Sequence, residues 1–129
     1  MFRTLLVDDN DLFRESLRAV LYRNFPTMEV DQAVDGATAL GYLGNPQLVF
    51  MDIRLPDING LELTRRFKAR QPGLLVCVVT QFDIPEYRDA ANQSGASEFF
   101  FKDSLTDAVV VGLVDSILAA QARVPLRIP

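Results

Sequence analysis

Short apolar runs alternate with segments of helical spacing along nearly the whole chain, and this alternation limits the possible folds more than any other feature. The apolar runs have the length of buried strands and occupy residues 2–7, 28–34, 47–51, 74–79 and 98–101. Helical spacing or capping residues mark the segments that follow them, at residues 11–24, 36–43, 59–70, 83–95 and 104–120. A strand–helix unit repeated in this way predicts an α/β fold, with a parallel sheet covered by helices on both faces.

Local signals predict where several of these helices begin and end. Asn59 followed by Glu62 is typical of a capping pair at a helix start, and we expect Asp83 and Ser104 to cap the two later helices. Gly95 is expected to end the helix that Asp83 begins. In the first helix we expect a buried apolar stripe, formed by Leu12, Phe13, Leu17, Val20 and Leu21.

The length of the chain is that of one domain with a substantial core. Its 129 residues contain no recognisable interdomain linker, so we predict one domain over residues 1–121 and a C-terminal tail or the start of a linker over residues 122–129. A net charge of −4 argues against this domain holding DNA, RNA or an anionic membrane by itself. The longest apolar run is far too short to cross a bilayer and no signal sequence opens the chain, so we expect a cytoplasmic protein.

Polar side chains directly follow four of the five predicted strands. Asp8 and Asp9 follow the first strand, Asp52 the third, Thr80 the fourth and Lys102 the fifth. Because sites in such sheets lie outside the carboxyl ends of the strands, we expect these groups to converge at one edge. Taken singly, each has an ordinary structural explanation, such as a charge at a helix start or a solvated lysine. Only the combination of these five residues indicates a chemical function.

The residue types in this set suit phosphoryl chemistry. The chain contains no histidine, which excludes a histidine base or phosphocarrier within it. Clustered carboxylates repel one another, and a hard cation such as Mg²⁺ relieves that repulsion. Lys102 adds a permanent positive charge, and the Thr80 hydroxyl can donate to a phosphoryl oxygen. Asp52 is the best placed carboxylate to act as a nucleophile and form an aspartyl-phosphate.

Four motifs in order extend this interpretation to a family. They are "LLVDDN", "LVFMDIRLPDINGLEL", "VVT" and "GASEFFFKD", each at a predicted strand end. Together they resemble the receiver domain of two-component response regulators, the CheY-like family, over residues 2–120. The longer segments "DDNDLFRESL" and "MDIRLPD" resemble those of receivers that carry a LuxR-type helix-turn-helix output domain. The resemblance implies a flavodoxin-like (βα)5 fold with strand order 2-1-3-4-5.

The resemblance also implies a role for each residue of the site. Asp52 would be the phosphoacceptor, and Mg²⁺ would be held by Asp9, Asp52 and the backbone carbonyl of Arg54. Asp8 would assist the metal through water, and Lys102 would pair with the phosphoryl group. The phosphodonor would be a phosphohistidine on a sensor histidine kinase. Such a domain is a phosphoacceptor that assists its own phosphotransfer and dephosphorylation, not an enzyme acting on other molecules.

In this family the signal leaves through a switch and a contact face. Thr80 would move inward on activation, and Phe99 takes the place of the aromatic switch residue. The expected face consists of residues 83–95, 98–101 and 104–120, and it would control transcription through a DNA-binding output domain that this chain does not include. The last helix is apolar almost all round, which favours a homodimer on this face. The expected interface residues are Ile84, Tyr87, Phe99, Val110 and Val114.

Residues at three positions bear on the alternatives to this function. A phosphatase of the haloacid dehalogenase type needs an acid two residues after its nucleophile, where this chain has Arg54. A flavin-binding domain needs a phosphate loop after the first strand, where "DDND" would repel a phosphate. A receiver-like interaction module that signals without phosphorylation stays open, because Gln81 stands where receivers often have a small residue. We also expect Gln81 to slow phosphoryl loss by crowding the attacking water.

Overall fold

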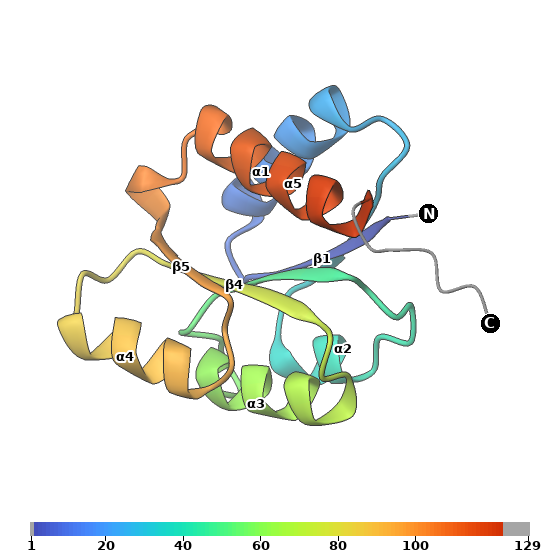
Figure 1. Ribbon diagram of the computed structural model, residues 1–129. Coiled ribbons are helices and arrows are strands. Elements are labelled where there is room, and N and C mark those ends of the chain that lie inside the picture. Colours follow the sequence, from blue (N-terminus) through green and yellow to red (C-terminus); the bar gives the residue numbers. More distant parts are fainter. Residues whose placement is uncertain (1, 123–129) are drawn as a thin grey trace.

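Five parallel strands form one sheet in the order β2-β1-β3-β4-β5, as predicted. The computed structural model describes residues 2–122, and Figure 1 shows its elements. These are β1 (Arg3–Val7), α1 (Asp11–Asn24), β2 (Glu29–Ala33), α2 (Gly36–Leu40), β3 (Leu48–Met51), α3 (Gly60–Arg70), β4 (Leu75–Thr80), α4 (Pro85–Gln93), β5 (Glu98–Phe101), a 3₁₀ turn (Lys102–Ser104) and α5 (Asp107–Ala122). Helices α1 and α5 cover one face of the sheet, and α2, α3 and α4 cover the other (Figure 1).

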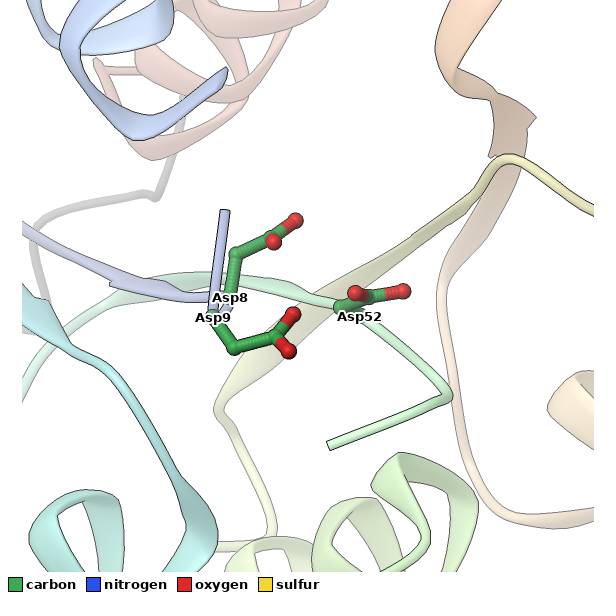
Figure 2. A group of neighbouring side chains, drawn as sticks. All are labelled: Asp8, Asp9 and Asp52. Carbon is green, nitrogen blue, oxygen red and sulfur yellow. The ribbon is translucent and has the colours of Figure 1, made fainter. Parts of the chain in front are cut away.

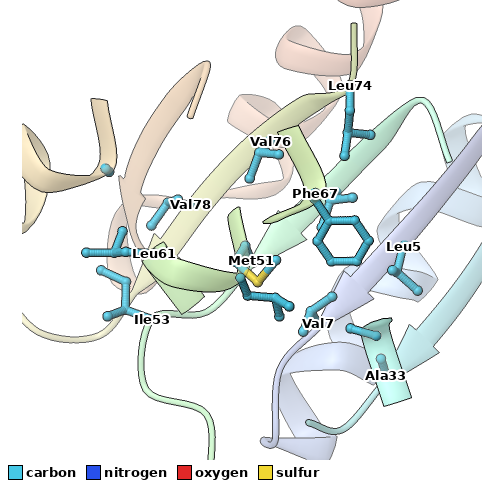
Figure 3. Close-up of a cluster of buried hydrophobic side chains, with 14 of the residues drawn as sticks. Leu5, Val7, Ala33, Met51, Ile53, Leu61, Phe67, Leu74, Val76 and Val78 are labelled. Atoms are coloured by element: carbon cyan, nitrogen blue, oxygen red, sulfur yellow. The ribbon is translucent and has the colours of Figure 1, made fainter. Parts of the chain in front are cut away.

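Each central strand supplies side chains to two cores, because successive residues of a strand point to opposite faces. In β3, Val49 and Met51 belong to the core beneath α2, α3 and α4, whereas Leu48 and Phe50 belong to the core beneath α1 and α5. Figure 3 shows the first of these cores. Strands buried on both faces read as continuous apolar runs, and this is why the sequence predicts their positions well.

Helix α3 begins and α4 ends as predicted. The Asn59 side chain accepts a hydrogen bond of 2.8 Å from the Leu61 N–H and so caps α3. Glu62 pairs with arginines of its own helix, at 3.0 Å from Arg65, so it does not complete a capping box. Gly95 follows α4 with φ of 99°, a conformation that glycine adopts without strain.

The predicted caps of α4 and α5 are wrong. Helix α4 begins at Pro85 after Ile84, not at Asp83, because proline at the first helical position needs no N–H partner. Helix α5 begins at Asp107, not after Ser104, because the chain first makes the 3₁₀ turn. The Thr106 hydroxyl then accepts a 3.3 Å hydrogen bond from the Val109 N–H.

The buried stripe of α1 also differs from the prediction at one position. Leu12 is 76% exposed, while Arg14 is buried beside Leu17. Helical spacing places Phe13 and Arg14, four and three residues before Leu17, on the same face as Leu17, and it turns Leu12 away.

No helix within residues 2–122 is long and apolar enough to cross a membrane. Of the predicted tail at 122–129, all but Ala122 lies outside the described residues.

Candidate functional site

The carboxyl ends of β1 and β3 bring three predicted carboxylates together. Asp8 and Asp9 follow β1, Asp52 follows β3, and each offers an oxygen that lies within 4.8 Å of the other two. Figure 2 shows the three side chains next to one another at this end of the sheet. Asp8 and Asp52 are buried, and Asp9 is exposed. The adjacency of β1 and β3 at the centre of the sheet produces this cluster.

Lys102 reaches this cluster from the end of β5. Its Nζ lies 2.8 Å from Asp8 Oδ2 and 3.6 Å from Asp52 Oδ2, and all three side chains are largely buried. The ammonium group also lies 4.5 Å from the centroid of the Phe13 ring. Lys102 therefore pairs most closely with Asp8 and leaves Asp52 with the weaker share of its charge.

The surroundings of Asp52 strongly affect its carboxyl group. Burial, and next the negative charge of Asp8, raise its pKa from 3.8 to about 6, although Lys102 and a hydrogen bond from the Ile53 N–H act in the opposite direction. Burial of a carboxylate disfavours its charged form, and a neighbouring carboxylate adds to that effect. One lysine is therefore too little positive charge to hold Asp52 at its ordinary pKa.

The donor set fits a hard divalent cation. Carboxylate oxygens from two strand ends meet at one point, and they carry more negative charge than Lys102 neutralises. Mg²⁺ prefers such oxygen ligands and uses few carboxylates with several waters. A cavity of about 340 Å³ lies directly beside the cluster, and its lining includes Asp9, Asp52, Arg54, Gln81 and Lys102. The backbone carbonyl of Arg54 as a further ligand remains a prediction.

Thr80 and Phe99 lie on the neighbouring strands β4 and β5. Thr80 ends β4 and is fully buried, and its hydroxyl accepts a 3.2 Å hydrogen bond from the Phe82 N–H. Phe99 pairs with Val78 across the sheet and is only 9% exposed. Its ring packs edge-on against Phe101 at 5.4 Å between centroids. Their movement on activation remains a prediction.

The loop between β3 and α3 holds the backbone of Asp52 in place. The Gly60 N–H donates a 2.7 Å hydrogen bond to the Ile53 carbonyl, and a Cβ at Gly60 would lie 1.8 Å from the Asp52 carbonyl oxygen. Only glycine permits this approach.

The Asp57 carboxylate, in the same loop, accepts hydrogen bonds from the N–H groups of Gly36 and Ala37, at 2.8 and 2.9 Å. These hydrogen bonds hold the pKa of Asp57 below its usual value.

Arg14 is a residue of the site that the sequence interpretation missed. Its buried guanidinium donates to the Asp8 carbonyl at 2.5 Å, to Gln32 Oε1 at 2.9 Å and to the Asp11 carboxylate. These bonds connect the end of β1, the first turn of α1 and strand β2. Its spacing of three residues from Leu17 is the signal that could have placed it on the buried face.

Two of the predicted interface residues belong to the core instead. Val110 is 2% exposed and Val114 is fully buried, because α5 turns both toward the sheet and α1. Phe99 is also largely buried, and the guanidinium carbon of Arg88 lies 4.8 Å above its ring. Ile84 and Tyr87 keep partial exposure. A partner on this face would therefore meet Ile84 and Tyr87 and not the two valines.

The sequence matches known proteins over most of its length. Residues 4–113 match the response regulator receiver domain family. "Transcriptional regulatory protein DegU" of Brevibacillus brevis is 32% identical over 82% of this chain and 46% of its own. "Uncharacterized transcriptional regulatory protein YxjL" of Bacillus subtilis (strain 168) is 30% identical over 92% of this chain and 53% of its own. The chain thus spans about half the length of these curated relatives.

Solved structures agree with this match. A two-component response regulator of the LuxR family from Aurantimonas sp. SI85-9A1 superposes with a TM-score of 0.79, at 30% identity, over 92% of this chain and 85% of that one. The signal receiver domain of the putative response regulator NarL from Mycobacterium tuberculosis gives a TM-score of 0.80 at 29% identity, over 95% and 98%. Fold, site geometry and sequence agree, and the chain belongs to the response regulator receiver domain family.

Proposed function

We propose that Asp52 accepts a phosphoryl group from the phosphohistidine of a sensor histidine kinase, in a reaction that depends on Mg²⁺. The observation that carries this proposal is the buried Asp52 carboxylate beside Asp8, Asp9 and Lys102, at the edge of a cavity. Buried carboxylates that a protein does not need for structure are costly. A role as nucleophile accounts for its place and for its perturbed pKa.

Each residue of the cluster would have its own role in this phosphoryl transfer. An Asp52 oxygen forms the new bond to phosphorus while the phosphorus–nitrogen bond of the donor breaks and the imidazole leaves with that electron pair. Asp9, Asp52 and the Arg54 carbonyl would hold Mg²⁺ with assistance from Asp8, and the bound ion would supply positive charge. Lys102 neutralises phosphoryl oxygens from the other side, and the Thr80 hydroxyl donates a hydrogen bond to one of them. Asp52 must be deprotonated to act.

The output of this reaction is proposed to be transcription. Matching relatives are transcriptional regulatory proteins about twice the length of this chain, and LuxR-family regulators are among the similar structures. We propose that residues 1–121 are the receiver unit and that they control a DNA-binding domain outside this chain. The α4–β5–α5 face would change on phosphorylation and form a homodimer. The protein would act in the cytoplasm, where its kinase partner and DNA are reached.

The proposal is tested by intact mass after incubation with acetyl phosphate. Wild type should gain one phosphoryl group with Mg²⁺ and none with a chelator, and Asp52→Asn should gain none in either. Asp115→Asn, an exposed aspartate on α5, is the matched control and should behave as wild type. Uptake that persists in Asp52→Asn would overturn the acceptor assignment. Absence of uptake in wild type, also with a histidine kinase as donor, would favour a receiver-like module that signals without phosphorylation.

A further inference from the structure

The Arg54 side chain connects the acceptor cavity to helix α4. Its guanidinium carbon lies 3.6 Å from the centroid of the Phe82 ring. Its Nε and Nη2 donate to the Tyr87 hydroxyl at 3.4 and 3.3 Å. Arg54 follows β3, Phe82 follows β4 and Tyr87 lies in the first turn of α4. Three segments that are distant in the sequence therefore meet at one guanidinium group.

Besides the packing of the Tyr87 ring against the core, few polar contacts hold helix α4 at this end. Its N-cap residue, Ile84, makes no side-chain capping hydrogen bond. Ala91 is the one residue of the helix that is buried, and it lies near the opposite end. A helix start without a capping side chain leaves N–H groups without intrahelical partners and frays more easily. The Arg54–Tyr87 contact is therefore a restraint on the first turn of α4.

Arg54 also lines the cavity beside the carboxylate cluster, together with Asp52, Lys102 and the Phe82 on which its guanidinium is stacked. Its present contacts are weak, because they are a ring face and two long hydrogen bonds to one neutral hydroxyl. A phosphoryl group would offer charged oxygens, and arginine binds such oxygens through short, paired hydrogen bonds that are much stronger. A phosphoryl group on Asp52 would therefore compete for Arg54.

We propose that Arg54 is a positioning residue that holds the first turn of α4 through Tyr87 and leaves Tyr87 when Asp52 is phosphorylated. The second half of this inference rests on the proposed function, and the first half does not. The arrangement gives the acceptor a direct path to α4 that does not pass through Thr80 or Phe99. Phe82 keeps the guanidinium oriented between its two possible partners.

Hydrogen exchange in the first turn of α4 tests this proposal in the full chain. The unphosphorylated wild type, Arg54→Gln and Tyr87→Phe are compared, with Arg66→Gln as the matched control, because Arg66 pairs only with Glu62 on α3 in the described contacts. Arg54→Gln and Tyr87→Phe should each speed exchange there about two- to tenfold, the factor expected for one hydrogen bond. Arg54→Lys, which keeps the charge over Phe82 but has a single donor group, should lie between wild type and Arg54→Gln. Arg66→Gln should match wild type.

Phosphorylated samples, with uptake measured by intact mass, test the release. Phosphorylated wild type should show the faster exchange of Arg54→Gln, and phosphorylation of Arg54→Gln should add nothing further. Equal exchange in all unphosphorylated forms would overturn the restraint. An increase on phosphorylation that is as large in Arg54→Gln as in wild type would overturn the release. A wild type that takes up no phosphoryl group contradicts the proposed function, whereas the unphosphorylated comparison still decides whether Arg54 holds α4.

Discussion

Replacing Asp52 by asparagine should stabilise the metal-free protein at neutral pH. Asp52 is buried beside Asp8, and its pKa is raised to about 6 from 3.8 in the unfolded chain. A folded-state pKa above the unfolded value means that the folded protein holds this proton more strongly. The contribution of Asp52 to stability is therefore fully present below about pH 4 and is lost as the pH rises to about 6. Asparagine is neutral throughout and avoids this loss.

The size of the effect follows from the pKa shift. The difference between about 6 and 3.8 is roughly 2 pKa units, which corresponds to about 3 kcal/mol at most. Asp52 borders the open cavity beside Arg54 and Gln81, so solvent and salt reduce this value. We expect about 1–2 kcal/mol of relative stabilisation of Asp52→Asn between pH 4.5 and pH 7.

Urea unfolding at a series of pH values, with a chelator present, measures this difference. The free-energy gap between Asp52→Asn and wild type should widen as the pH rises. Asp57→Asn is the control of opposite sign, because the pKa of Asp57 is lowered by hydrogen bonds from Gly36 and Ala37. Its deficit relative to wild type should be present at neutral pH and shrink as the pH falls through the folded pKa. A constant gap for Asp52→Asn, or a wild type that is the more stable at pH 7, would refute the reasoning.

Three further changes test the surroundings of the acceptor. Gly60→Ala places a Cβ against the Asp52 carbonyl oxygen, so it should lower the free energy of unfolding in urea by about 1–3 kcal/mol and reduce phosphoryl uptake. The control is Gly112→Ala, which has open space around it and should be neutral or stabilising. An unchanged Gly60→Ala would show that the loop shifts freely. Arg14→Met removes the hydrogen bonds to the Asp8 carbonyl and Gln32, so it should lower the free energy of unfolding by about 1–3 kcal/mol and weaken Mg²⁺ binding measured by calorimetry. An unaltered Mg²⁺ affinity would show that Arg14 contributes to folding alone. Gln81→Ala should shorten the half-life of the phosphorylated protein, since Gln81 lines the acceptor cavity; an unchanged half-life removes that role.

The sequence predicts the sheet and the carboxylate cluster at its edge well for a physical reason. Strands buried on both faces must be apolar along their length, so their ends are visible as the first charged residue. Asp8 and Asp52 are such residues, and the parallel order of the strands brings them together. Lys102 is the first charged residue after the three phenylalanines of β5, although this edge strand is only partly buried. None of these placements depends on details of side-chain packing.

The errors of the sequence interpretation arise where packing decides. Helix α5 is apolar on most of its surface because it packs on α1 as well as on the sheet, so Val110 and Val114 belong to the core. Arg14 was missed because a buried charge is acceptable only where partners from other segments surround it, and its partner Gln32 lies on strand β2. The contact of Arg54 with Phe82 and Tyr87 likewise joins three separate segments. The structural preferences of single residues carry no information on such contacts between distant segments.

The measurement that tests the central claim most directly is chemical identification of the phosphorylated residue. An aspartyl-phosphate is reduced by borohydride to homoserine, whereas an unmodified aspartate is not. Peptide mass mapping of the reduced wild-type protein, after incubation with acetyl phosphate and Mg²⁺, should find homoserine at position 52 alone. Homoserine at Asp8 or Asp9, or no conversion in a sample whose intact mass shows a phosphoryl group, would contradict the assignment of Asp52 as the acceptor.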